Sequence, residues 1–259
     1  MSEAAVPKVG SGTIHISVRH LDLAYGSRVV QQDLSFDILR GQVFVIMGKS
    51  GCGKSTLMRH LIGLQEPKSG QILFGGTDLW KCPPATQSTI LRRTGVLFQS
   101  GALWSSRTLS ENVALPLEEY TDLSSEEIRD IVSLKLSLVG LSGFEDYYPS
   151  ELSGGMRKRA GLARAMALDP EVLFFDEPSS GLDPVSSHRL DRLIRELCDS
   201  LGTTVVLVTH ELASILGIGD VAVFLDSQAR TITARGNPRA LLNDRDNRHL
   251  REFLTRGEA

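Results

Sequence analysis

Residues 48–55 have the spacing of a loop that binds phosphate groups. A glycine opens the segment, four variable residues follow, and Gly-Lys-Ser closes it. Glycines let successive backbone N–H groups point to one centre, and a helix expected to begin near Lys54 directs its positive dipole end at the same place. The residues predicted to contact phosphate are Gly48, Lys49, Ser50, Gly51, Cys52, Gly53, Lys54, Ser55 and Thr56.

Three of these side chains have separate expected tasks. Lys54 would contact the β- and γ-phosphates of a nucleotide, the Ser55 hydroxyl would bind Mg²⁺, and Thr56 would add a phosphate hydrogen bond. The alternative is a glycine-rich turn before a helix. A match at four fixed positions arises by chance in roughly one chain in a hundred of this length, so a phosphate site is favoured.

A second site is expected where an apolar segment, residues 172–175, ends in Asp176 and Glu177. Pro178 cannot continue a strand ladder. At the carboxyl edge of a strand, Asp176 can hold Mg²⁺ through water. Strand alternation would turn Glu177 the other way, where it could polarise an attacking water as a general base. The alternative is a pair of solvated loop acids.

A weaker signal lies about twenty residues earlier, in the sequence Leu-Ser-Gly-Gly-Met. Ser153 is the expected N-cap of a helix whose first turn, with Gly154 and Gly155, is aimed at an anion. Many helices begin in this way, so the motif is specific only together with the phosphate loop. The basic run from Arg157 to Arg159 is interpreted as a solvated helix face.

The elements that must position these residues form an α/β pattern. Strands are predicted over residues 13–23, 42–47, 172–175 and 203–208, and the last three are apolar enough to be buried on both faces. Helix-length segments separate them, which predicts a parallel sheet. Residues 110–140 carry acidic amphipathic helical segments, one of which begins at Ser124. The tail, residues 237–259, is polar and helix-prone, with Leu250, Phe253 and Leu254 on one face.

Composition excludes several classes of protein. The chain has 259 residues, of which 41% are hydrophobic, and 28 Lys and Arg against 31 Asp and Glu give a net charge of −3. A disordered chain and a strongly basic nucleic-acid binder are therefore not expected. Three distant cysteines fit a reducing cytoplasm. The apolar runs are too short to span a bilayer, and residues 1–12 lack the apolar core of a secretory signal.

Taken in order, these motifs resemble the nucleotide-binding domain of ABC transporters over nearly the whole chain. The resemblance implies a P-loop NTPase (RecA-like) core with a mainly parallel sheet, an antiparallel β subdomain and an inserted α-helical subdomain. It implies one domain over residues 13–236, with the core at about 13–98 and 160–236, the helical subdomain at about 99–159, and a C-terminal tail. The further residues that match this family are Tyr25, Gln99, Asp183 and His210.

The resemblance also implies how these residues act on ATP and Mg²⁺. Tyr25 would stack on adenine, Gln99 would bind the metal, Glu177 and His210 would hold the attacking water, and Asp183 belongs to the loop at residues 180–183. Two copies would form a head-to-tail dimer, in which Ser153, Gly154 and Gly155 of one copy close over ATP on the other. Taken singly, each of these three residues favours another interpretation: Tyr25 as a core aromatic at a strand end, Gln99 as a surface amide and His210 as a satisfied histidine at a strand end.

A narrower resemblance rests on residues 98–104 and on Met156, where the family commonly has glutamine. Both are similar to the ATPase subunit of MCE-type lipid transporters, which include the Mla phospholipid system of Gram-negative bacteria. The implied location is the cytoplasmic face of the inner membrane, and the implied partners are an integral-membrane permease, an MCE-domain lipid-binding protein and a small STAS-domain protein. Residues 100–117 would receive the permease, and the apolar face of the tail would either reach the neighbouring copy or pack on its own domain.

Two alternatives stay open at this point. The same ATPase could serve a permease for an amino acid, an ion or a drug. A soluble ABC ATPase acting on ribosomes or DNA is the other possibility, but such proteins commonly carry two linked nucleotide domains or a coiled-coil insertion. The near-neutral charge gives no electrostatic footprint for nucleic acid.

Overall fold

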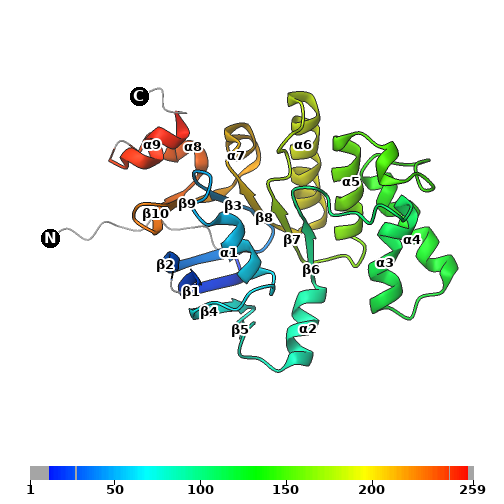
Figure 1. Cartoon of the computed structure of the whole chain (residues 1–259), viewed down its shortest axis with the longest axis horizontal. Coiled ribbons are helices and arrows are strands. Elements are labelled where there is room, and N and C mark those ends of the chain that lie inside the picture. The colour runs from blue at the N-terminus through cyan, green and yellow to red at the C-terminus, as the bar shows by residue number, and fades with distance from the viewer. Residues whose placement is uncertain (1–11, 27, 245, 256–259) are drawn as a thin grey trace.

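The computed structural model describes residues 12–26, 28–244 and 246–255, which form an α/β fold with two sheets (Figure 1). The strands are β1 (Ile14–Tyr25), β2 (Arg28–Leu39), β3 (Val43–Met47), β4 (Ser69–Phe74), β5 (Thr77–Asp78), β6 (Thr94–Leu97), β7 (Val172–Asp176), β8 (Thr204–Thr209), β9 (Val221–Asp226) and β10 (Thr231–Gly236). The helices are α1 (Lys54–Leu61), α2 (Pro84–Arg92), α3 (Leu109–Tyr120), α4 (Ser125–Leu138), α5 (Gly154–Ala165), α6 (Pro184–Leu201), α7 (Leu212–Ile218), α8 (Pro238–Leu241) and α9 (Arg248–Leu254), with a 3₁₀ turn at Pro149–Glu151.

The larger sheet has the strand order β10-β9-β3-β8-β7-β6. β3 pairs in parallel with β8 and β9, β7 pairs in parallel with β6 and β8, and β10 joins the edge of β9 antiparallel. The second sheet, in the order β2-β1-β4-β5, is antiparallel. The predicted fold class, with its mainly parallel sheet and its antiparallel part, is confirmed.

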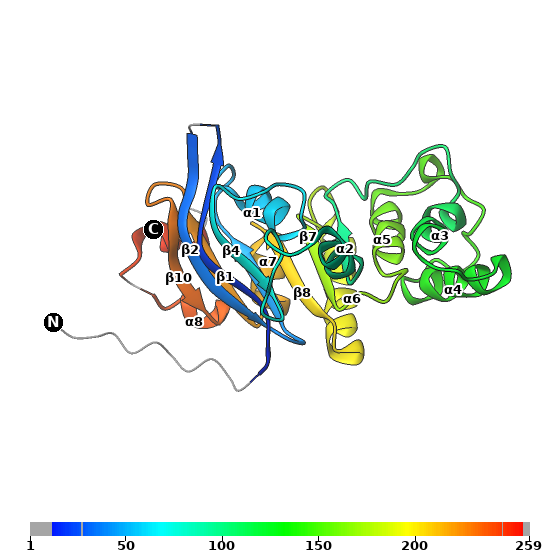
Figure 2. The ribbon, with the colours of Figure 1, turned by 90° about the horizontal axis from the view of Figure 1, so that it is seen from below.

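The central strands are apolar throughout because both faces of the parallel sheet are covered. In β3, Val43, Val45 and Met47 join the core formed with helices α3 to α7 and α9, whereas Phe44 and Ile46 join the core beneath α1 and the antiparallel sheet. Phe44 stacks on Phe36 of β2 with ring centroids 5.3 Å apart. Figure 2 shows the antiparallel strands lying along this second face.

Helices α3, α4 and α5 gather at one end of the molecule, as Figures 1 and 2 both show. They follow β6 in the chain and precede β7, so they form the inserted helical part. The predicted helix start at Ser124 is confirmed: its hydroxyl accepts from the backbone N–H of Glu127, and the Glu127 carboxylate accepts from the backbone N–H of Ser124. α5 also packs on β6 and thereby connects the helical part to the sheet.

The tail folds back on its own chain. Leu250, Phe253 and Leu254 of α9 are buried in the same core as β9, and the ring of Phe253 lies 5.4 Å from that of Phe224. Of the two arrangements left open by the sequence, the structure has the one within the chain. Over the residues that the structure describes, every helix falls short of the length and apolarity that a membrane crossing requires.

Candidate nucleotide-binding site

The phosphate loop connects the buried strand β3 to α1, which begins at Lys54 as predicted. Two glycines in the loop cannot be replaced without movement. A Cβ on Gly48 would lie 2.6 Å from the backbone oxygen of Leu225, and Gly53, with φ at +104°, would place a Cβ 2.7 Å from Val30. The backbone is therefore folded tightly over the carboxyl end of the sheet, and within the loop the N–H of Cys52 donates to the backbone oxygen of Lys49 at 3.2 Å.

Lys54 is buried beneath this loop, with 6% of its surface exposed. Its Nζ donates to the backbone oxygen of Gly48 at 2.9 Å and to that of Lys49 at 3.3 Å, and it lies 3.8 Å from the carboxylate of Glu177. The ammonium group is thus held at the point toward which the loop and the first turn of α1 converge.

Asp176 ends β7 next to the first turn of α1. The Ser55 hydroxyl donates to its carboxylate at 2.9 Å. Burial raises the pKa of Asp176, while the hydrogen bond from Ser55 works against this rise. A cation near the two oxygens would relieve the cost of the buried charge, so the pair has the chemistry of a hard-cation site.

Glu177 departs from strand geometry, with φ at +48°. The prediction that alternation turns it to the opposite face is therefore wrong, because a left-handed residue breaks the alternation. Its Oε1 lies 2.8 Å from Nδ1 of His210, which donates when that nitrogen carries the proton. Glu177 is 9% exposed, and its carboxylate thus lies between Lys54 and His210. Unusual backbone conformations of this kind gather at functional sites.

Lys54, Ser55, Glu177 and His210 line one cavity of about 640 Å³, and Asp176 adjoins it through its hydrogen bond with Ser55. Gln99 reaches it from the loop after β6 and donates to the Ser180 hydroxyl at 3.2 Å. The structure brings together most of the predicted site, and the cavity is lined by Arg28, Val29, Val30, Ser50, Gly51, Cys52, Gly53, Lys54, Ser55, Thr56, Gln99, Glu177, His210, Ser227 and Arg230.

Two cationic residues in this lining were not predicted from the sequence. Arg28 opens β2, and Arg230 lies in the turn between β9 and β10. The backbone N–H of Gln32 donates to the backbone oxygen of Arg230 at 2.8 Å, which brings the two segments together. No local motif marks either arginine, so only the long-range pairing could reveal them.

Other predicted residues lie outside the cavity. Ser153 caps α5 by accepting from the N–H of Met156, and Gly154 and Gly155 lie beside Leu182. Asp183 caps α6 and accepts from the N–H groups of Val185 and Ser186 at 3.0 Å. The Lys49 side chain turns away to an ion pair with Glu252 of α9 at 3.1 Å. The side chain of Tyr25 lies outside the described residues.

The basic run in α5 is not a solvated face, so that interpretation is wrong. Arg157 donates to the backbone oxygen of Leu152, and Arg159 donates to those of Val139 and Gly140. Lys158 is buried and donates to the backbone oxygens of Pro178 and Ser180. All three cations tie neighbouring loops to the helix.

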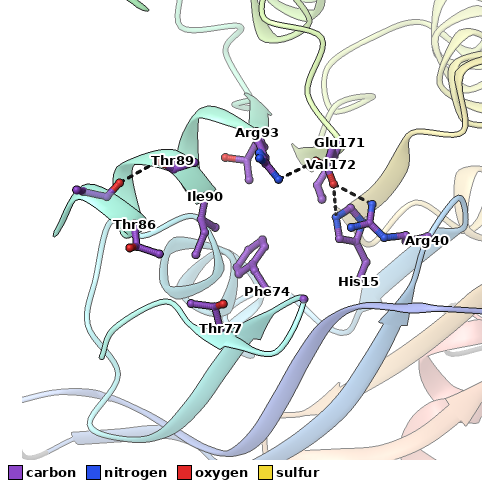
Figure 3. Close-up of a pocket in the computed structure, with 13 residues that line it drawn as sticks. His15, Arg40, Phe74, Thr77, Thr86, Thr89, Ile90, Arg93, Glu171 and Val172 are labelled. Atoms are coloured by element: carbon purple, nitrogen blue, oxygen red, sulfur yellow. Dashed lines mark hydrogen bonds and ion pairs between the residues drawn. The ribbon is translucent and has the colours of Figure 1, made fainter. Parts of the chain in front are cut away.

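A second cavity, of about 520 Å³, lies at the amino end of β7 (Figure 3). Glu171 accepts from Arg40 at 2.8 Å and Arg93 at 3.3 Å, and it lies 3.3 Å from the ring of His15. These charges satisfy one another and join the antiparallel sheet to the parallel one. The cavity therefore lies where the two sheets meet, at the amino end of the parallel strands, whereas the phosphate loop lies at their carboxyl end.

Comparison with known proteins agrees with this geometry. The family model described as ABC transporter matches residues 31–180. The chain is 43% identical over 241 residues to a probable ribonucleotide transport ATP-binding protein, mkl, of Mycobacterium leprae, covering 93% of this chain and 69% of that protein. It is 41% identical over 244 residues to the intermembrane phospholipid transport system ATP-binding protein MlaF of Haemophilus influenzae, covering 94% and 91%.

A solved structure shares the fold. The ATP-binding cassette MJ0796, described as a dimer in a post-hydrolysis state bound to ADP and Pi, superposes with a TM-score of 0.77 at 27% identity. The match covers 86% of this chain and 99% of the cassette.

Proposed function

Because the chain belongs to the ABC transporter family and is an ATPase of that type, we propose that it powers a membrane complex that moves phospholipids between two membranes. The observation that supports this substrate is the 41% identity to MlaF, which extends over 94% of this chain and 91% of that protein. The alignment therefore covers nearly the whole of both chains.

The cavity supports hydrolysis by in-line attack of water on the terminal phosphate. Glu177 would take a proton from the water, the new P–O bond would form as the bond to the β-phosphate oxygen breaks, and ADP would leave. His210 lies 2.8 Å from the Glu177 carboxylate and would orient it. Lys54, together with the N–H groups of the loop, would stabilise charge on the phosphoryl oxygens.

Magnesium fits two residues at the edge of the cavity, of which Ser55 lines it and Asp176 contacts Ser55. Ser55 and Asp176 offer two hard oxygen atoms 2.9 Å apart, in agreement with the preference of Mg²⁺ for a few protein oxygens completed by phosphate and water. With Gln99 in the role implied by the family, these side chains would hold the ion. When bound, Mg²⁺ would neutralise charge on the β- and γ-phosphates.

A second copy of the chain would complete each site. Ser153, Gly154 and Gly155 cap the amino end of α5 but do not line the cavity on their own chain. In a head-to-tail dimer they would face ATP on the partner, where a helix amino end favours an anion. Asp183, beside the same surface, would belong to that interface.

The permease would dock between the helical part and the sheet. A groove of about 440 Å³ lies there, between α2, α3 and α5, and Tyr120 at its rim is 47% exposed with Arg92 4.7 Å from its ring centre. Of the predicted docking segment, residues 100–117, Pro116 lines this groove, whereas Trp104, which is 58% exposed, is not among the lining residues. An MCE-domain protein and a small STAS-domain protein would complete the complex, at the cytoplasmic face of the inner membrane.

A second candidate substrate comes from the relative mkl, whose name refers to ribonucleotide transport. That match is 43% identical but covers 69% of that protein, so the remaining third has no counterpart in the alignment. The ATPase chemistry would be the same in both cases, and the permease would decide the substrate.

The test uses tagged Glu177→Gln chain purified from detergent-solubilised membranes in the presence of ATP. This variant should bind ATP but hydrolyse it at least about a hundredfold more slowly, because the amide cannot accept the proton. Glu196→Gln, on the exposed face of α6, is the matched control and should keep wild-type turnover. Wild-type turnover in Glu177→Gln would refute the role of base.

Mass spectrometry of the same preparation tests the substrate. A polytopic permease together with an MCE-domain protein would support lipid transport. A different permease with a small-solute binding protein would overturn the substrate and leave the ATPase chemistry intact. Ribosomal proteins, or an absence of membrane partners, would overturn transport itself.

A further inference from the structure

Lys158 is a buried cation that the proposed hydrolysis does not use. It lies in the second turn of α5 and is 6% exposed. Its Nζ donates to two backbone oxygens, that of Pro178 at 2.6 Å and that of Ser180 at 2.5 Å. Within the described ranges, no carboxylate forms a salt bridge with it at 4.0 Å or less.

Burying a lysine at such a position carries a desolvation cost for its ammonium group. Burial lowers the pKa of the ammonium group, although the charge of Glu177 acts in the opposite direction. An apolar side chain of similar length would avoid the desolvation cost. The two short contacts to carbonyl oxygens are therefore the feature that distinguishes lysine from methionine here.

The segment that Lys158 holds touches the proposed hydrolytic groups. Pro178 directly follows Glu177, and the hydroxyl of Ser180 accepts from Gln99. The backbone N–H of Ser180 also donates to the backbone oxygen of Glu177 at 3.1 Å. A shift of this segment would therefore move the candidate base, at which a displacement of about 1 Å can cost about a hundredfold in rate.

Lys158 lies close to the first turn of the same helix, which is the turn proposed to face an anion. Lys158 follows Gly155 by three residues, which is less than one turn of α5 and about 4.5 Å along its axis. Since a helix of this length moves as a rigid body, a displacement of its first turn must reach Lys158. Figure 1 shows α5 with α3 and α4 on one side and the strands β6 and β7 on the other.

We propose that Lys158 is a positioning residue that couples the amino end of α5 to the segment carrying Glu177. This inference rests on the proposed dimer, in which the amino end of α5 from one copy closes over ATP on the other. Closure of the partner's site would then pull on the Glu177 segment of the same copy through Lys158. The residue would link the two ATP sites.

Two variants separate this role from packing. Lys158→Met keeps the length and apolar stem but removes both donors, and Lys158→Arg keeps the charge and the donors. Lys158 does not line the cavity, so ATP affinity measured with a fluorescent analogue should stay within about twofold of wild type. We expect kcat to fall about ten- to a hundredfold in Lys158→Met, and the Hill coefficient for ATP to fall from above 1 to 1. Lys158→Arg should recover most of both.

The control is Lys68→Met, at an exposed lysine, which should change neither value. If Lys158→Met does not fold, Lys158→Gln, which keeps an amide donor, is measured in its place. A wild-type chain that binds ATP without hydrolysing it would overturn both the proposed function and this inference. Wild-type hydrolysis with an unchanged kcat and Hill coefficient in Lys158→Met would overturn this inference alone.

Discussion

Substitution of Leu250 by alanine tests whether the tail packs on its own chain in solution. Leu250 is 0% exposed and packs, with Phe253 and Leu254, into the core beside β9. Truncation of a fully buried leucine costs about 2.7–5 kcal/mol, through lost transfer free energy and the cavity left behind. α9 lies at the edge of the core and can partly relax into the space. We therefore expect a loss of about 3 kcal/mol in the free energy of unfolding.

Thermal and urea unfolding measure this loss directly. At about 2–4 °C per kcal/mol for a chain of this size, the melting temperature should fall by about 6–12 °C. Leu242→Ala is the matched control, because Leu242 belongs to the same tail but is 46% exposed, and a surface change of this kind costs within about 0.5 kcal/mol.

Protein concentration provides the decisive arm of the experiment. If α9 packs within its own chain, the loss in the free energy of unfolding of Leu250→Ala is the same at about 1 µM and at about 50 µM protein. A docking site on another copy would respond to this roughly fiftyfold change in concentration through mass action. A loss that changes with concentration would mean that the tail docks on another copy. A loss below about 1 kcal/mol would refute the burial of Leu250 in the core.

Two further predictions concern buried ionisable groups. Burial raises the pKa of Asp191, although the hydrogen bond from Ser214 acts in the opposite direction. The protonated carboxyl therefore contributes stability that is complete below the unfolded-state pKa of about 3.9. This stability is lost as the pH rises through the higher pKa of the folded state. Asp191→Asn should therefore gain stability relative to wild type as the pH rises from below about 3.9 to about 7 in urea titrations, and an equal difference at both ends of this range would contradict this. Cys52 and Cys198 are buried, which raises the pKa of both thiols, that of Cys198 to about 11, whereas Cys82 is half-buried. A thiol reagent should thus modify Cys82 first in the native protein, and simultaneous reaction of all three thiols would refute the burial of the other two.

Features that depend on neighbours in the sequence could be predicted well. The phosphate loop, the start of α1 at Lys54 and the cap at Ser124 are each specified within a few residues. The buried strands were also recognisable, since a strand covered on both faces needs an apolar residue at every position. In each case the local chemistry and the global fold require the same residues.

Features that depend on distant segments could not be predicted. Lys158 stands in a run of three cations that resembles a solvated helix face, and only the approach of the segment after β7 gives it buried partners. Arg230 reaches the cavity because β10 turns back along β9. The apolar face of α9 was evident from its spacing, but spacing alone does not say which surface covers it.

The segment after β7 connects the cavity to the surface at the amino end of α5 that is proposed to face the partner. At its start, Glu177 lines the cavity beside Lys54, and at its end Leu182 lies against Gly154 and Gly155 at the amino end of α5. Lys158 fixes the middle of the segment from one side, and on the other side Ser179 lies 3.4 Å from Ser214, on the helix that follows His210. Such a segment cannot shift at one end while the other stays in place. In the proposed dimer, closure over the partner's ATP and alignment of the chain's own carboxylate are therefore parts of one movement, and separate substitutions at the two ends should give non-additive losses in kcat.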